Sequence, residues 1–272
     1  MNATMIIMRK ELRDAVRSRW LIAFSATFAI VALALAMVQE RGDVGVQGFD
    51  RTTASLVNLC LLLVPLLTLV VGAGAIAGER DRGTLVTLRA QPLSPNELLF
   101  GKYLGLAIAV WMAVALGFGI AGLLIGLVSP VTGIGHYFLF VALSGFLAMG
   151  TLSIGMLISV ISEGRARALA IAVLAWFVFV IFYDLAAMGF ALLVTGSGES
   201  LLAVTLGNPV ESVRILAVLS LDPELQVLGP LGAYLYESFG TAGSTFILLG
   251  GVLAWTVVPL TAAALLFRGQ DA

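Results

Sequence analysis

The chain has 272 residues and a formal net charge of −1; 60% of the residues are hydrophobic and only 11% are charged. Soluble globular proteins carry roughly 25% charged residues, so this composition excludes a soluble domain, and the near-zero charge gives no indication of nucleic-acid binding. Cys60 is the single cysteine and lies inside an apolar run, which excludes an internal disulfide.

Apolar runs of the length that a membrane helix requires, roughly 20 residues, recur six times. The first run is longer than the ~7–15 residues of a signal-peptide core, and a long segment with acidic residues precedes it, so we interpret it as a retained span. The prediction is an all-α, polytopic membrane protein with a six-helix transmembrane domain over residues 20–272. The expected spans are about Trp20–Val38, Ala54–Ala77, Tyr103–Val128, Tyr137–Ile161, Ala168–Val194 and Gly243–Phe267.

Lysine and arginine are distributed unequally between the two sides of these spans. Twelve of the fifteen cations fall in the amino-terminal segment, the second and fourth loops and the carboxyl tail. The other side has only Arg41, Arg51 and Arg214. Because cytoplasmic loops carry the excess of cations, we expect both termini in the cytosol.

Residues 1–19 have the pattern of an amphipathic helix. Apolar side chains recur at spacings of three and four, at Met5, Met8, Leu12, Ala15 and Val16. The other face is charged, with Arg9, Lys10, Glu11, Arg13, Asp14 and Arg17. This pattern predicts a cytosolic elbow helix in the lipid headgroup layer; the alternative is a charged tail whose periodicity is accidental.

The loop between the second and third spans, residues 78–102, is short and charged. Glu79–Arg82 forms a charged cluster, and Thr84–Ala90 can form about two helical turns. Ser94 and Glu97 then have the spacing of a capping box, which opens the next helix. The sequence therefore predicts a short helix on a charged cytosolic loop, which is suited to transmitting a movement of another protein that binds it. An ordinary charged connector is the alternative.

The largest extracytoplasmic segment, residues 195–242, is too apolar for a solvated linker. Asn208-Pro209 is typical of a helix start, and Glu211 and Arg214 are adjacent on that helix. We expect one or two short helices on the outer membrane surface or capping the bundle. The segment either packs on the bundle or docks another protein, and the candidate docking residues are Asn208, Pro209, Glu211, Arg214 and Leu216.

Residues suited to catalysis or metal binding are sparse. Asp184 is the only ionisable side chain within the spans, and an interhelical hydrogen bond suits it better than proton transport. Cys60, the single histidine His136 and the intramembrane methionines are scattered, so no metal site is expected. The sequence has no Gly-x-x-x-x-Gly-Lys-[Ser/Thr] motif and no His or Lys base within a span. We expect neither a catalytic site nor a bound cofactor in this chain.

Glycines spaced four residues apart predict close contacts between helices. The three pairs are Gly74 and Gly78, Gly101 and Gly105, and Gly122 and Gly126. Pro65 and Pro259 are expected to bend the second and sixth spans.

Over essentially its whole length, the chain resembles the ABC-2 family of ABC-transporter permeases. The resemblance rests on the six spans, the amino-terminal helix and the loop motif Glu79…Gly83-Thr84-Leu85…Pro92…Gly101-Lys102. It implies that the loop holds a coupling helix, which sits in a groove of a separate ATPase. The implied coupling residues are Glu79, Arg80, Asp81, Arg82, Gly83, Thr84 and Leu85, with Glu163 and Arg165 in the fourth loop.

Shorter motifs are similar to those of the NosY-type permeases, which serve nitrous-oxide-reductase maturation. They are Arg9-Lys10-Glu11-Leu12, Phe182-Tyr183-Asp184 and Asn208-Pro209…Glu211…Arg214. The resemblance implies a permease homodimer in a bacterial or archaeal cytoplasmic (inner) membrane, two cytosolic ABC ATPases that hold ATP and Mg²⁺, and a periplasmic β-helical partner serving the copper centres of the reductase. Arg80-Asp81-Arg82 departs from the acidic run expected at that position. The alternatives are export of a drug, lipid or other small molecule by an ABC-2 permease and, less favoured, a stand-alone secondary carrier.

Overall fold

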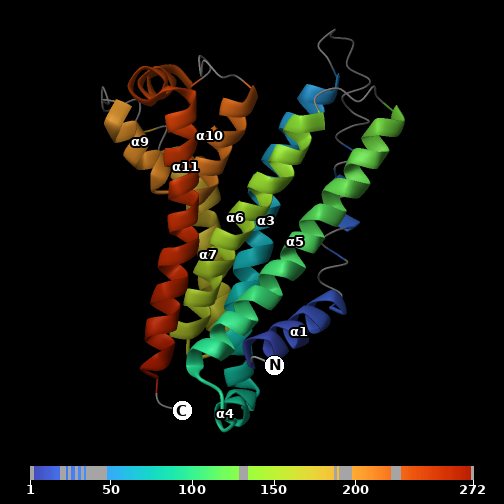
Figure 1. The fold of residues 1–272 in the computed structure, drawn as a ribbon, viewed down its shortest axis with the longest axis vertical. Coiled ribbons are helices and arrows are strands. Elements are labelled where there is room, and N and C mark those ends of the chain that lie inside the picture. The colour runs from blue at the N-terminus through green and yellow to red at the C-terminus, as the bar shows by residue number, and fades with distance from the viewer. Residues whose placement is uncertain are drawn as a thin grey trace.

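The computed structural model describes residues 3–18, 48–128, 134–186, 198–221 and 228–270, with a few isolated positions between them. Throughout these residues the regular structure is helical, and the helices form one elongated bundle (Figure 1). The first predicted span, Trp20–Val38, lies mostly outside the described residues.

The described part of the chain contains five helices that are long and apolar enough to cross a membrane. They confirm helices at the second to sixth predicted spans. In chain order they are α3 (Gly48–Asp81), α5 (Pro95–Val128), α6 (Ile134–Ile161), α7 (Arg165–Phe177), which the π-helical η1 (Val178–Phe182) continues, and α11 (Gly229–Arg268).

Between α7 and α11 the chain forms a sharply bent pair of short helices, α9 (Gly198–Leu206) and α10 (Pro209–Leu221). The two helices are inclined at 117° across a short break, which has the geometry of a broken span or a re-entrant loop. Three apolar side chains of α10, Val213, Ile215 and Leu216, are buried in a core that also includes residues of α6 and α11. We call this pair the hairpin. It packs against the end of the bundle as a cap, and its apolar side chains are buried there.

The last helix changes direction at Gly240, whose φ of 67° and ψ of 176° are not helical. Glycine adopts this region without the steric cost that a Cβ would impose. Across the bend, the Ser244 hydroxyl donates to the Leu235 carbonyl at 3.0 Å. The predicted sixth span, Gly243–Phe267, therefore begins just after the bend, while the preceding helical segment lies across the end of the bundle (Figure 1).

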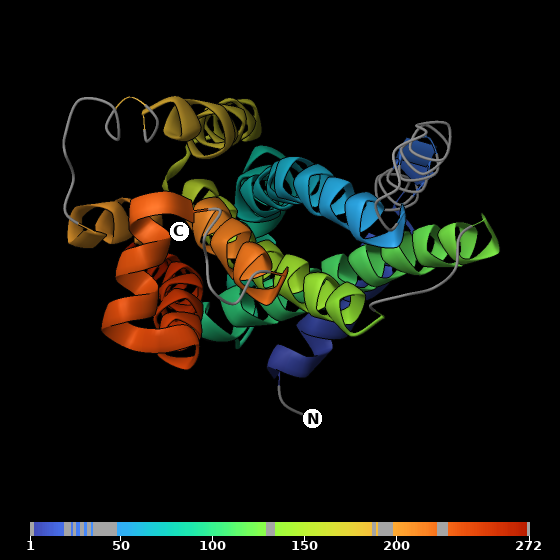
Figure 2. The ribbon, with the colours of Figure 1, turned by 90° about the horizontal axis from the view of Figure 1, so that it is seen from above.

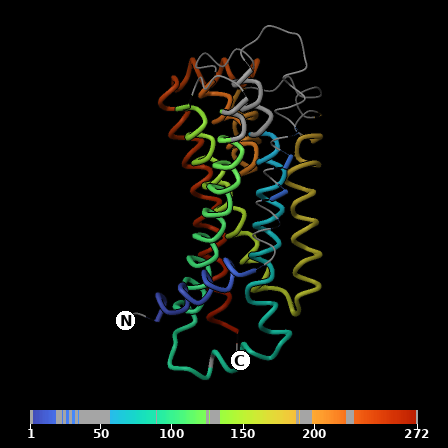
Figure 3. Tube along the Cα trace, turned by 90° about the vertical axis from the view of Figure 1, so that its right-hand side faces the viewer, coloured from blue at the N-terminus to red at the C-terminus, as the bar shows by residue number. Residues whose placement is uncertain are grey.

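The amino-terminal helix α1 (Ala3–Val16) crosses the first half of α5 at an angle (Figures 1 and 3). A Cβ at Gly101 would lie 2.8 Å from the Cβ of Ile7, and one at Gly105 would lie 2.7 Å from the Met8 carbonyl oxygen. The predicted pair Gly101 and Gly105 thus permits a close helix contact, and its partner is α1.

The tightest approach between α3 and α6 uses two glycines that the four-residue pattern did not identify. A Cβ at Gly155 would lie 2.7 Å from the Leu69 carbonyl oxygen and 3.1 Å from the Cα of Gly72. By contrast, a Cβ at Gly74 would meet no atom within 4 Å. Next to this approach, the hydroxyls of Thr68 and Thr151 lie 2.6 Å apart.

The two ends of the bundle carry different features. Helices α1 and α4 (Thr84–Arg89) and the carboxyl end of the chain lie together at one end, which we call the α4 end (Figures 1 and 3). The hairpin lies at the opposite end, which we call the hairpin end (Figure 1). Both described termini are therefore at the same end of the bundle, as the topology prediction requires.

Candidate functional sites at the two ends of the bundle

A buried ion-pair triad joins three helices at the α4 end. The Lys102 ammonium of α5 lies 2.7 Å from Glu11 Oε1 of α1 and 2.7 Å from Glu79 Oε1 of α3. The Lys102 side chain is only 2% exposed. Removing a charge from water costs several kcal/mol unless a partner compensates, so Lys102 fixes the relative positions of α1, α3 and α5.

The sequence pattern placed Glu11 on the polar outer face of α1, and this was wrong. Its side chain is only 13% exposed and is directed at Lys102. Burial acts to raise the pKa of Glu11, but the neighbouring ammonium groups of Lys102 and Lys10 outweigh it and hold that pKa below its usual value. Sequence reasoning also did not identify Lys102 as a site residue; the available signal was a lone lysine directly before an apolar span, where a buried cation requires an acidic partner.

Glu79 lies inside the protein, so its position does not suit direct contact with an ATPase. It is 5% exposed, and its second carboxylate oxygen, Oε2, is buried without a hydrogen-bond partner in the described structure. The backbone carbonyl of Glu79 accepts a hydrogen bond from the Thr84 hydroxyl at 3.2 Å. Glu79 therefore attaches the loop to the bundle, and a coupling role for it has to act through this attachment.

Arg80 and Asp81 hold the turn between α6 and α7. The guanidinium of Arg80 donates to the Ser162 carbonyl, where α6 ends, and to Gln270 Oε1 at 2.8 Å. Asp81 Oδ2 accepts from the backbone N–H of Arg165, the first residue of α7, at 2.8 Å. A cation at a helix carboxyl end and an anion at a helix amino end both complement the helix dipole. The end of α3 thus supplies caps to two other helices.

The α7 N-cap position lies close to the Asp81 carboxylate. Gly164 occupies it, and a Cβ there would lie 2.8 Å from Asp81 Oδ1. The cap is therefore supplied by a side chain of another helix. This arrangement couples the start of α7 to the end of α3.

Helix α4 forms the tip of the α4 end; most of its described side chains are exposed, and Leu85 is buried. Gly83 has a φ of 69°, which ends α3 and redirects the chain into α4. Leu85 is buried with Ile7 of α1 and Phe267 of α11, whereas Val86 is 63% exposed. Arg82, Thr84 and Thr87 are also exposed. The exposed face thus combines a cation, an aliphatic side chain and hydroxyls.

The neighbouring turn between α6 and α7 adds further exposed charge. Glu163 and Arg167 form an exposed pair at 3.0 Å, with side-chain exposures of 87% and 60%. The Arg165 side chain is also exposed. The predicted coupling residues therefore form two groups. Asp81, Arg82, Gly83, Thr84, Glu163 and Arg165 are exposed, whereas Glu79 and Leu85 are buried and Arg80 is half-buried.

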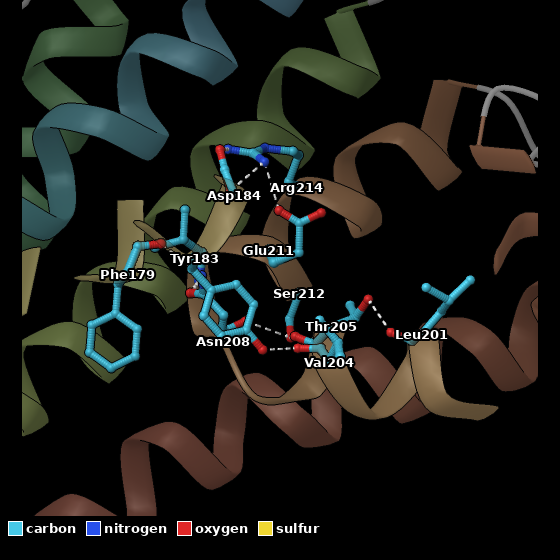
Figure 4. Close-up of polar contacts among 11 residues, drawn as sticks. Phe179, Tyr183, Asp184, Leu201, Val204, Thr205, Asn208, Glu211, Ser212 and Arg214 are labelled. Atoms are coloured by element: carbon cyan, nitrogen blue, oxygen red, sulfur yellow. Dashed lines mark hydrogen bonds and ion pairs between the residues drawn. The ribbon is translucent and has the colours of Figure 1, made fainter. Parts of the chain in front are cut away.

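A second charged cluster joins α7 to the hairpin (Figure 4). Arg214 of α10 binds both carboxylate oxygens of Asp184, at 3.0 and 2.9 Å, and also Glu211 Oε2 at 2.7 Å. The predicted adjacency of Glu211 and Arg214 on a helix is confirmed, and Asp184 has the interhelical bond expected of it. Bidentate arginine–carboxylate pairs are among the strong hydrogen-bonded contacts in proteins.

The last carbonyls of α9 accept hydrogen bonds from side chains of other elements. The Tyr183 hydroxyl donates to the Val204 carbonyl, and Ser212 Oγ donates to the Thr205 carbonyl at 3.0 Å (Figure 4). Trp255 Nε1 of α11 donates to the Leu206 carbonyl at 2.9 Å. The final carbonyls of a helix have no partner within the helix itself. The turn of the hairpin is therefore bound to α7, α10 and α11 together.

Asn208 both caps α10 and binds the π-helical segment. Its Oδ1 accepts from the Val210 N–H at 2.9 Å, and its Nδ2 donates to the Phe179 carbonyl at 2.7 Å. A π-helical turn shifts the hydrogen-bond pattern of a helix, and here a carbonyl of η1 is bound by a side chain from outside. The predicted start of a helix at Asn208-Pro209 is confirmed.

The docking role predicted for the hairpin residues conflicts with their positions. Asn208 is 0% exposed, Leu216 is 5% exposed and Pro209 is buried, so they contact their own chain. Glu211 and Arg214 are half-buried; Glu211 is paired with Arg214, and Arg214 also binds Asp184. The reason is topological: the hairpin folds back between α7 and α11, which turns its apolar face inward. A metal-ligand set of three or more His, Cys, Asp or Glu side chains does not occur within the described residues.

Comparisons with known proteins identify one family of membrane transport proteins. The family described as "ABC-2 family transporter protein" matches residues 5–272. A protein of Stutzerimonas stutzeri named "Probable ABC transporter permease protein NosY" is 33% identical over 280 residues, which cover 98% of this chain and 99% of that protein. A protein of the same name from Pseudomonas aeruginosa is 34% identical over 224 residues, covering 79% of this chain and 82% of that protein.

Proposed function

Since the chain belongs to the ABC-2 family of transporter proteins, we propose that it is a permease subunit that couples ATP hydrolysis by a separate ATPase to conformational work across the membrane. One observation carries this proposal. The exposed turn of α4 is mounted on a charged support, formed by the Lys102 triad and by the caps that Arg80 and Asp81 supply. A force applied to such a turn is passed to the bundle, because the support holds the ends of α1, α3, α5, α6 and α7 together.

The orientation follows from the distribution of cations. Arg80, Arg82 and Arg165 lie at the α4 end, which also carries the amino-terminal helix and the carboxyl end of the chain. The positive-inside rule places this end in the cytosol. There the exposed face of α4 would meet a cytosolic ABC ATPase that holds ATP and Mg²⁺. The hairpin end would then face the periplasm of a bacterial inner membrane.

The similarity to proteins named NosY supports a more specific role. We propose that the permease forms a homodimer with two ATPase subunits, and that the movement it transmits serves copper-centre maturation of nitrous-oxide reductase through a periplasmic β-helical partner. The chain itself would contribute movement and attachment rather than catalysis.

The test is assembly with the ATPase. The permease is co-expressed with the ABC ATPase of its transporter, purified in detergent through a tag on the permease, and the retained ATPase is quantified. Val86→Asp and Arg82→Glu should each reduce retention at least tenfold, because a charge is placed or reversed in the core of a packed contact. Ser238→Asp is the matched control, since Ser238 is exposed at the opposite end. Equal retention by all three variants would refute the proposed docking surface.

A further inference from the structure

We propose that α7 is the element that transmits movement from the α4 end to the hairpin, with Asp81 and the Asp184–Arg214 pair as the positioning residues at its two ends. This inference rests on the proposed function, because it takes the ATPase as the source of the movement. It adds a specific route through the bundle and names the contacts on which that route depends.

The first end of the route is the start of α7. Asp81 Oδ2 binds the backbone N–H of Arg165, and the adjacent Arg80 binds the Ser162 carbonyl of the same turn. Both residues belong to the last turn of α3, which ends at Asp81, two residues before Gly83. A displacement of α4 therefore reaches α7 directly, through a charged cap at its first residue.

The other end of the route lies on the hairpin. Three residues near this end of the helix bind hairpin atoms: the Phe179 carbonyl accepts from the Asn208 amide, the Tyr183 hydroxyl donates to the Val204 carbonyl, and the Asp184 carboxylate binds the Arg214 guanidinium. Figure 4 shows the Tyr183 and Asn208 contacts at the turn of the hairpin and the Asp184–Arg214 pair further along α10. The bidentate pair fixes distance as well as orientation, because both guanidinium nitrogens are used.

Between these two ends, α7 is less enclosed than the other spans. The helical stretch Arg165–Ala186 has 22 residues, which is about 33 Å at 1.5 Å per residue. Only 17% of its apolar window is buried, compared with 72% for α6. In Figure 2 it lies at the edge of the bundle, beside α3. Its two fully buried alanines, Ala168 and Ala172, pack with α3 and α6 side chains, and small side chains interlock little with a neighbouring helix.

The hairpin is bound to α7 on one side and to α11 on the other, so a displacement of α7 should tilt the hairpin. On one side lie the α7 contacts, and on the other the Trp255 indole of α11 donates to the Leu206 carbonyl at 2.9 Å. Between them lies Gly207, where a Cβ would be 2.6 Å from the Tyr183 hydroxyl oxygen. When α7 moves along its axis relative to α11, the hairpin should rotate about this turn. The hairpin end would change shape without a change in the packing of α3 on α6.

Pulsed electron paramagnetic resonance of the assembled complex tests this route. Spin labels are attached at Ala203→Cys on α9 and Leu116→Cys on α5, both exposed, in a chain whose buried native cysteine is removed by Cys60→Ala. The label distance is measured with the ATPase bound, first without nucleotide and then with a non-hydrolysable ATP analogue. We expect a nucleotide-dependent shift in the otherwise wild-type chain. Asp184→Ala and Asp81→Ala should each reduce it by more than half while the ATPase remains bound.

Two further variants separate positioning from structural damage. Asp184→Glu keeps the carboxylate and should restore most of the shift, and Glu199→Gln changes an exposed carboxylate of the same hairpin and should leave the shift unchanged. If Asp184→Ala does not fold, Arg214→Lys, which keeps the cation but loses the bidentate geometry, should give an intermediate shift. A full shift in Asp184→Ala or in Arg214→Lys would overturn the inference, as would the absence of any shift in a chain that binds the ATPase. Failure of the unmutated chain to bind the ATPase would instead refute the proposed function, and the inference with it.

Discussion

The ammonium of Lys102 and the carboxylate of Glu79 are 2.7 Å apart in a site where the lysine side chain is 2% exposed. This pair connects the beginning of α5 to the end of α3, and Glu11 brings α1 to the same ammonium. The loop that carries α4 is thus attached to the bundle by buried charge, and the stability of the α4 end should depend on that charge balance.

We expect Lys102→Met to destabilise the protein by about 3–5 kcal/mol, because it leaves the buried Glu79 carboxylate without a cation and leaves Glu11 with only the exposed Lys10. Reversible unfolding in mixed micelles measures the difference. Arg167→Ala is the control; its pair with Glu163 is exposed and should cost less than about 1 kcal/mol. Combining Lys102→Met with Glu11→Gln and Glu79→Gln should recover part of the loss. A cost for Lys102→Met as small as that of the control would contradict the assignment of the triad.

The attachment of α1 should weaken in acid. The pKa of Glu11 is held below its usual value by Lys102 and Lys10, so Glu11 contributes stability above the unfolded-state pKa of about 4.3. That contribution is lost as the pH falls through the lower pKa of the folded state. Hydrogen exchange of α1 should therefore be faster in Glu11→Gln than in the unmutated chain at pH 7. The difference should vanish at low pH, and a difference that stays constant across that range would exclude Glu11 as the titrating group.

Two glycines within membrane-length helices should respond differently to an added methyl group. Gly155→Ala places a Cβ 2.7 Å from the Leu69 carbonyl oxygen and should cost about 1–3 kcal/mol by separating α3 from α6. Gly74→Ala meets no atom within 4 Å and should be neutral or stabilising by up to about 1 kcal/mol. Unfolding of the two variants in the same micelles compares them. Equal effects would show that the two helices can move apart without cost.

The hairpin offers a matched pair of variants that distinguishes packing from docking. Leu216→Asp places a charge in the core and should lower the melting temperature and the yield of folded protein, because the new carboxylate has no partner there. Leu221→Asp alters a side chain at the end of the same helix that is 42% exposed, and it should leave the melting temperature unchanged. Fluorescence-detected size-exclusion chromatography after heating measures both. A normal melting temperature for Leu216→Asp would show that this face of α10 is more accessible than the structure places it.

Local features of the sequence predicted local features of the structure well. The spacing of Ser94 and Glu97 predicted a capping box, and Glu97 Oε2 indeed accepts from the Ser94 N–H at 2.9 Å. The three-residue spacing of Glu211 and Arg214 likewise predicted their ion pair. Such contacts depend on helix periodicity alone, which is why they can be inferred without knowledge of the fold.

Contacts between distant segments could not be predicted in the same way. Periodicity placed Glu11 on an outer face because it counts charged residues as exposed, and the acidic partner that Lys102 requires could not be chosen from sequence. The burial of Leu216 depends on the hairpin folding back between α7 and α11, a feature of topology. For the same reason, the contact between Gly155 and Gly72 has no signal in the spacing of either helix taken alone.

The triad also has a consequence for biosynthesis. Lys102 follows Glu11 by 91 residues and Glu79 by 23. At about 5–20 residues per second, Glu11 is made about 5–18 s before the ammonium that binds it. During that interval α1 lacks both its ion-pair partner and the groove at Gly101 and Gly105 that receives it, since both belong to α5. Docking of α1 is therefore a late step, which the nascent chain can complete only after α5 has been synthesised.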